Sequence, residues 1–352
     1  MSSINQPLQR IKPSRVILPV LIGLSVVGYL FYREFNPRIF DNLELTWRSV
    51  VFILIAVFCM SGRDIGYMMR IRILSGGKMS WRQAFRVIML WEFTSAVTPA
   101  AVGGTSVAVI FVHKEGISLG NSSTIVLLTS FLDELYFLIV FPLIIFLTGI
   151  GNLFAIDSGN TLAHSLITFA MIGYSVKALW VIMLGYGLFI NPRALKMLLM
   201  RIFSWRTLRR WRGEINRIGS DIVAGSKRAR SSGIKFWGGA LGSTFLSWSA
   251  RYLVANALIM AFFGVSNHLM LFARQLVMWI MMLVMPTPGG SGFAEVIFSN
   301  YCADLIEVPA VLQLSAATLI AFLWRGISYY PYLAIGAFVF PRWLRRNFGK
   351  QK

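Results

Sequence analysis

Long apolar segments recur along the chain with the length of membrane-spanning helices. An uninterrupted apolar segment of about 20 residues crosses the roughly 30 Å hydrocarbon core of a bilayer as an α-helix. The segments of this kind lie at about 16–32, 46–69, 119–149, 161–190, 236–264 and 308–340. We therefore expect an all-α integral membrane protein with about six full transmembrane helices.

The distribution of Lys and Arg predicts the orientation of these helices, because positively charged loops remain in the cytoplasm. Basic residues concentrate in the N-terminus, in Arg63 to Arg86, in 191–235 and in Arg342 to Lys352. If all four lie inside, the apolar segment 81–112 must begin and end inside, and the segment 268–303 must begin and end outside. Both termini are then cytoplasmic, and the two segments are predicted to be re-entrant hairpins.

The two hairpins have similar sequences. The first contains Thr98-Pro-Ala-Ala-Val-Gly-Gly104, and the second contains Pro286-Thr-Pro-Gly-Gly290. Similar hairpins entering from opposite faces are typical of inverted repeats in transporters. We expect an N-terminal membrane half at 1–190, a basic cytoplasmic linker at 191–235 and a C-terminal membrane half at 236–352.

The overall composition supports a membrane protein and excludes several other classes. Of 352 residues, 56% are hydrophobic and 14% are charged, whereas soluble domains carry roughly 25% charged residues. The net charge of +20 lies in loops beside the spans, which favours anionic lipid over nucleic acid as the partner. Cys59 and Cys302 have no paired spacing, so neither a disulfide framework nor a metal site is expected. No phosphate-loop, dinucleotide or catalytic-triad pattern occurs, so we expect no cofactor and no enzymatic activity.

The basic linker contains an apolar stripe at helical spacing, which includes Trp205, Leu208, Ile215, Ile218 and Ile222. Such a stripe between basic faces is typical of a helix lying at the membrane interface. The alternative is a soluble helix packed on neighbouring loops.

Helix-breaking residues at membrane depth leave backbone groups that hydrocarbon cannot satisfy. We expect a short helix to begin after each Gly-Gly pair, with Thr105, Ser106 and Ser291 as caps. The free N–H groups of such a helix suit an anion such as a phosphate. The alternative is that Pro and Gly only permit tight turns and close helix packing.

Several ionisable residues are predicted to lie near the middle of the bilayer, where each charge costs about 3 kcal/mol or more. They are Glu92, Asp133, Glu134, Lys177, Arg251, Glu295 and Arg325. A polar cavity or a set of structural ion pairs, such as Glu295 with Arg325, explains them equally well.

Three motifs resemble the flippase-like transmembrane region of the lysylphosphatidylglycerol synthases, also called multiple peptide resistance factors. They are Thr98 to Gly104 with Lys114-Glu-Gly-Ile117, Pro286-Thr-Pro-Gly-Gly-Ser-Gly-Phe-Ala-Glu295, and Phe322-Leu-Trp-Arg325 with Tyr329. The resemblance covers about 45–340 and implies a bacterial cytoplasmic membrane protein that moves a modified phospholipid between leaflets. It also implies that Glu295, Arg325 and both Gly-Gly turns belong to a central cavity.

The chain departs from the family in two respects. It ends at Lys352 after its last span, so we expect no aminoacyl-transferase domain. The pair Asp133-Glu134 replaces an expected basic-plus-acidic pattern, which leaves the head group open. The candidate substrate-binding residues are Gly103, Gly104, Thr105, Asp133, Glu134, Lys177, Arg251, Pro288, Gly289, Gly290, Ser291, Glu295 and Arg325.

A lipid translocator is the favoured function. One alternative is an intramembrane enzyme that uses Glu295 or Asp133 for acid–base chemistry. Another is a small-solute transporter or a subunit that supports a partner enzyme. The expected partners are a phospholipid or lipid-linked substrate, anionic lipids at the cytoplasmic face, and a homo-oligomer or partner enzyme.

Overall fold

The computed structural model describes residues 39, 43–98, 100–154, 161–205, 209, 212–282, 289–290 and 292–348. Five helical segments in this part of the chain are long and apolar enough to cross a membrane. They are α2 (Trp47–Leu74), α5 (Leu119–Thr148), α7 (Thr161–Gly185) with the π-helical turn η3 (Tyr186–Ile190), α10 (Ile234–Phe262), and α13 (Ala310–Ser328) with α14 (Tyr330–Phe348). The prediction of a helical, multi-pass membrane protein is confirmed. The predicted first helix at about 16–32 lies outside the described residues.

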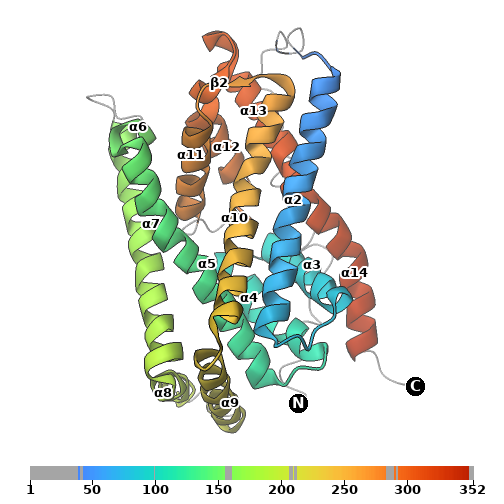
Figure 1. Ribbon diagram of the computed structural model, residues 1–352, viewed down its shortest axis with the longest axis vertical. Helices are drawn as coiled ribbons and strands as arrows, with labels where there is room; N and C mark the ends of the chain where they lie inside the picture. Colours follow the sequence, from blue (N-terminus) through green and yellow to red (C-terminus); the bar gives the residue numbers. More distant parts are fainter. Residues whose placement is uncertain are drawn as a thin grey trace.

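Two pairs of shorter helices occupy opposite halves of the bundle (Figure 1). The first pair is α3 (Trp81–Val97) and α4 (Ala100–Lys114), and the second is α11 (His268–Met281) and α12 (Phe293–Cys302). The pair α3–α4 lies in the half that also carries the linker helices α8 and α9 (Figure 1). We call this half the basic end and the half with α11 and α12 the opposite end.

Polar side chains define where the short helices begin. At α3, the Ser80 hydroxyl accepts a hydrogen bond from the Gln83 N–H, and the Gln83 side chain accepts one from the Ser80 N–H at 2.8 Å. This reciprocal pattern is a capping box, which satisfies N–H groups that have no intrahelical partner. At α11, the Asn267 side chain accepts a hydrogen bond from the Met270 N–H at 2.9 Å.

The same order of elements occurs twice along the chain. A long helix is followed by a pair of short helices and then another long helix, first as α2 to α5 and then as α10 to α13. The two leading helices, α2 and α10, run in opposite directions and pack along each other (Figure 1). Gly66 permits their close approach, because a Cβ atom there would lie 2.9 Å from the Ser243 carbonyl oxygen and 2.3 Å from the Ser247 hydroxyl.

The last span is broken in its middle. The segment predicted as one helix at 308–340 divides at Tyr329 into α13 and α14. Pro331 accounts for the break, since proline has no N–H group and its ring clashes with the carbonyl four residues earlier. The break brings Tyr329 to the same region as the tips of the two short pairs, as described below.

At the opposite end, the short α6 (Ile150–Phe154) follows α5, and two strands tie α10 to α13. The strands β1 (Gly264–Val265) and β2 (Ile306–Glu307) pair in antiparallel register, with Gly264 opposite Glu307. The 3-10 turn η6 (Ala303–Leu305) leads from α12 into β2.

The basic linker forms α8 (Pro192–Ile202) and α9 (Arg212–Arg230), which pack on each other, and α9 also packs on the start of α5. In α9, Ile222 is buried and Ile218 is half-buried, so this part of the predicted apolar stripe faces protein, as the packed alternative expects. The exposed apolar side chains lie on α8 instead, where Met197, Leu198 and Ile202 are all exposed. Leu208 lies outside the described residues.

Candidate functional site

The helix pair α11–α12, which corresponds to the second predicted hairpin, is fixed by an ion pair that is almost completely buried. Arg325 on α13 donates from Nε to Glu295 Oε1 at 2.9 Å and from Nη2 to the Gly289 carbonyl at 3.1 Å. The side chains of Arg325 and Glu295 retain 4% and 1% of their exposure. Gly289, Gly290 and Gly292 have φ angles of +57°, +67° and +83°, which side chains with a Cβ atom rarely adopt. Arg325 therefore holds a turn that only glycine accommodates easily.

The second oxygen of Glu295 closes the start of α12. Its Oε2 atom accepts a hydrogen bond from the Gly292 N–H at 2.8 Å. A carboxylate at this position satisfies a free N–H group and interacts favourably with the positive end of the helix. The anion site predicted at this helix start is therefore filled by the protein's own carboxylate. Pro288 and Ser291, predicted to belong to the same turn, lie outside the described residues.

The tips of the two hairpins meet at Tyr329. Its hydroxyl donates to the carbonyl oxygen of Ala96, near the end of α3, at 3.1 Å. A Cβ atom at Gly289 would lie 3.0 Å from the same carbonyl oxygen and 2.4 Å from the Tyr329 ring. The break between α13 and α14, the end of α3 and the glycine turn of the second hairpin are thus in direct contact.

The first Gly-Gly pair does not form the turn that the sequence predicted. The helix α4 begins at Ala100, so Gly103, Gly104 and Thr105 lie within it and Thr105 is not its cap. Only the first four N–H groups of a helix lack intrahelical partners, and those of Gly104 and Thr105 come after them. A Cβ atom at Gly104 would lie 2.9 Å from the Ser95 Cα atom, so this glycine permits close packing of α4 on α3, as the alternative interpretation expected.

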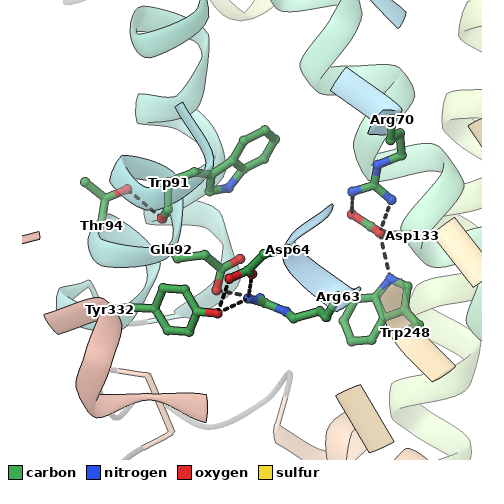
Figure 2. Close-up of polar contacts among 9 residues, drawn as sticks. All are labelled: Arg63, Asp64, Arg70, Trp91, Glu92, Thr94, Asp133, Trp248 and Tyr332. Atoms are coloured by element: carbon green, nitrogen blue, oxygen red, sulfur yellow. Dashed lines mark hydrogen bonds and ion pairs between the residues drawn. The ribbon is translucent and has the colours of Figure 1, made fainter. Parts of the chain in front are cut away.

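Three polar residues of α2 form a stripe that faces the interior of the bundle. Arg63, Tyr67 and Arg70 follow one another at spacings of four and three residues and are all buried. The two guanidinium carbons lie 4.6 and 4.9 Å from the centre of the Tyr67 ring. Each arginine organises one group of polar side chains, and Figure 2 shows both groups.

Arg63 binds two carboxylates from different helices. Its Nη1 atom lies 2.8 Å from Asp64 Oδ1, and its Nη2 atom lies 2.6 Å from Glu92 Oε2 on α3. The Tyr332 hydroxyl on α14 donates to Asp64 Oδ2 at 2.7 Å and accepts from Arg63 Nη1 at 3.1 Å. This group ties together α2, α3 and α14 (Figure 2).

Arg70 holds Asp133 with two parallel bonds, Nη1 to Oδ1 at 2.5 Å and Nη2 to Oδ2 at 3.0 Å. The Trp248 indole on α10 donates to the same carboxylate at 2.7 Å (Figure 2). The neighbouring Glu134 accepts from Lys177 Nζ on α7 at 2.6 Å. The predicted Asp133-Glu134 pair thus turns its two carboxylates toward different cations.

Arg251 on α10 differs from the other cations of this region, because no carboxylate contacts it among the described residues. Its guanidinium lies 4.0 Å from the centre of the Trp279 ring and 5.6 Å from that of Trp248. Its buried Nε atom has no hydrogen-bond partner in the described part of the chain. Arg251 lies near enough to Arg63 and Glu92 for their charges to act on it.

The exposure of the paired groups is unequal. The cations Arg63, Arg70 and Lys177 retain between 1% and 5% of their side-chain exposure, whereas their carboxylate partners retain between 19% and 22%. These partners are Asp64, Glu92, Asp133 and Glu134. The carboxylate side chains are therefore more accessible than the cations that pair with them.

Sequence reasoning counted Arg63 and Arg70 only as part of a basic cytoplasmic segment and did not include them among the candidate site residues. Both lie within α2, which ends at Leu74 rather than near 69. The available signal was the spacing of Arg63, Tyr67 and Arg70, which places two arginines and a tyrosine on one helix face. Asp64 and Tyr332 were also missed, since neither belongs to a recognisable motif.

Comparison of the sequence with known proteins shows the family to which the chain belongs. A family profile described as "Lysylphosphatidylglycerol synthase TM region" matches residues 16–336. A protein of Archaeoglobus fulgidus named "UPF0104 membrane protein" is 24% identical over 337 residues, which cover 91% of this chain and 94% of that protein. The chain therefore belongs to the family defined by the transmembrane region of lysylphosphatidylglycerol synthases.

Proposed function

We propose that this protein moves a lipid with a polar head group between the two leaflets of the membrane. The observation that carries the proposal is the contact between two short helix pairs from opposite ends, beside a network of buried ionic residues whose carboxylates remain accessible. We interpret the two pairs as re-entrant hairpins of an inverted repeat, with both termini and the basic end in the cytoplasm. In transporters of this design, substrate sites lie near the bilayer midplane at the interface between repeats.

The energetics of buried charge support a polar ligand. Each charged side chain at the bilayer centre costs at least roughly 2.5–3.5 kcal/mol, and pairing with a counter-ion reduces this cost. Pairing alone accounts for Arg325 with Glu295, which are both fully enclosed. It does not account for Arg251, which has no carboxylate partner in the described region, nor for the second carboxylate on Arg63, since Asp64 and Glu92 share that one cation. A ligand with its own charge supplies what these groups lack.

In this proposal, different residues bind different parts of the head group. Arg251 is the cation available for a phosphate, because Lys177 and Arg325 are occupied by Glu134 and Glu295. The exposed edges of Asp64 and Glu92 are available for an amine or for hydroxyl groups.

Movement between leaflets requires the two halves to change their contact. Polar bonds between the halves include Tyr329 to Ala96, Tyr332 to Asp64 and Trp248 to Asp133. Rocking of one repeat against the other exposes a fixed central site to each side in turn. The broken span at Tyr329 gives the last helix two parts that can follow different halves.

The test is leaflet exchange in proteoliposomes with fluorescent phosphatidylglycerol, phosphatidylethanolamine and lysylphosphatidylglycerol. We expect exchange with the native chain, loss in Arg251→Gln, partial activity in Arg251→Lys, and native activity in Arg193→Gln. Arg193 is an exposed arginine of α8 and serves as the matched control. Exchange no faster than in empty liposomes for every lipid would refute the proposal.

The same samples separate translocation from the two other functions considered. An intramembrane enzyme would change the mass of the added lipids, whereas a translocator changes only their sidedness. A small-solute transporter would accumulate a water-soluble substrate without exchanging lipid. Mass spectrometry of the extracted lipids therefore accompanies each exchange assay.

A further inference from the structure

A lateral groove opens beside the network at the junction of α2, α3 and α14. It has a volume of about 490 Å³, within the range of roughly 300–1,000 Å³ that is common for small-molecule sites. Its apolar wall includes Met68, Phe85, Met89 and Val339, and two arginines, Arg82 and Arg86, lie on its α3 side.

The groove leads toward the acidic edge of the network. On α3, Phe85 and Met89 are one turn apart, and Glu92 lies three residues further along. On α2, Met68 lies one turn from Asp64. From Arg82 to Glu92 the helix advances ten residues, or about 15 Å. A molecule in the groove therefore has a basic group at one end and the partly exposed side chains of Asp64 and Glu92 near the other.

The two arginines of the groove differ in availability. Arg86 binds both oxygens of Glu115, at 2.8 and 3.1 Å. Arg82 is exposed and has no polar partner in the described part of the chain. Next to it, Trp81 is also exposed, and Arg72 stacks on its ring at 4.2 Å. Tryptophan and arginine at the same level are typical of the head-group region of a membrane.

We propose that this groove docks one phospholipid from the surrounding leaflet, with an acyl chain on the apolar wall and the phosphate on Arg82. An apolar wall next to a free guanidinium matches an amphiphile with one chain and one anionic group. A protein partner matches less well, since stable interfaces bury about 1,200 Å² or more. The groove would be the lateral entrance to the network, and only this last role rests on the proposed translocation.

The test uses the full chain in vesicles of phosphatidylglycerol and phosphatidylcholine that contain a phosphatidylglycerol with a photoreactive acyl chain. Peptide mapping is expected to place the cross-links on Phe85, Met89 and Val339. Arg82→Gln should reduce this labelling about fivefold, the effect of one charge at an anionic surface. Lys78→Gln, which removes an exposed charge in the neighbouring loop, should leave it unchanged.

Three results would overturn the inference: labelling spread evenly over the helices, equal effects of the two substitutions, or cross-linking of the groove to a co-purifying protein. Leaflet exchange measured on the same vesicles separates this inference from the function proposed above. Exchange without groove labelling would refute the groove and leave translocation standing. Groove labelling without exchange would refute translocation and leave the groove standing as a lipid-binding site.

Discussion

Removing one partner of the Arg325–Glu295 pair tests whether the second hairpin depends on it. Arg325→Met leaves the Glu295 carboxylate, which is 1% exposed, without its counter-ion. It also leaves the Gly289 carbonyl without the 3.1 Å bond that holds the turn. Breaking a buried pair from one side typically costs about 3–5 kcal/mol. We expect a loss of this size in the free energy of unfolding, with a similar loss for Glu295→Leu.

The double variant separates a structural role from a functional one. Replacing both members of a buried pair by apolar residues of similar volume is often neutral or stabilising. Arg325→Met with Glu295→Leu should therefore recover most of the stability that either single change removes. Tryptophan fluorescence, followed while dodecyl sulfate is added to the protein in detergent micelles, measures the free energy of unfolding of the native chain and of the three variants. The non-additivity of the three losses gives the coupling between the two residues.

Leaflet exchange by the double variant then decides between the roles. We expect exchange to follow stability, because Glu295 and Arg325 are enclosed and satisfied by each other and by the turn. A stable double variant without any exchange would show that the pair contacts substrate, and would refute this assignment. Additive losses in stability would refute the pairing itself.

Two further substitutions test the packing of the halves. Gly66→Val should destabilise the protein by about 1–3 kcal/mol, because its side chain would meet the Ser243 backbone on α10. Gly62→Ala on the same helix faces open space and should not destabilise the protein. Equal stabilities of the two variants in the micelle titration would refute the close approach of α2 and α10. Tyr329→Phe should cost about 1 kcal/mol through loss of the bond to Ala96, and Tyr186→Phe, an exposed control, should cost nothing. Faster proteolysis of the 75–80 loop in Tyr329→Phe alone would report loosening of the first hairpin.

The helical framework was predictable because hydrocarbon imposes one rule on all spans. Every backbone polar group must find a partner within its own segment, so apolar length alone predicts a helix. The predicted segments 119–149 and 236–264 agree with α5 and α10 to within two residues at each end. The positions of the short helix pairs followed from the distribution of basic residues, which required 81–112 and 268–303 each to begin and end on one side of the membrane.

The pairing of the ionic side chains was not predictable, because it depends on how helices rotate about their axes. Depth counting brought Asp133, Lys177 and Arg251 to a common level, but depth says nothing about which side chains face each other. Arg70 rather than Lys177 binds Asp133, and Arg251 contacts tryptophan rings. The first Gly-Gly pair was misread for a related reason, since glycine permits both a turn and close helix contact, and tertiary packing decides between them.

The number and placement of charges in the network affect both its stability and its proposed function. Among the described residues of the network, basic and acidic groups are equal in number, namely Arg63, Arg70, Lys177, Arg251 and Arg325 with Asp64, Glu92, Asp133, Glu134 and Glu295. Overall neutrality lowers the free-energy cost of burying them.

The charges are nevertheless distributed unevenly in space, since Arg63 contacts two carboxylates and Arg251 contacts none in the described region. The local excess of one negative charge beside Arg63 faces an excess of one positive charge at Arg251. A head group that carries both charges can lie between them without changing the total charge, whereas an anion alone leaves the acidic side unmatched. Zwitterionic head groups should therefore exchange faster than purely anionic ones.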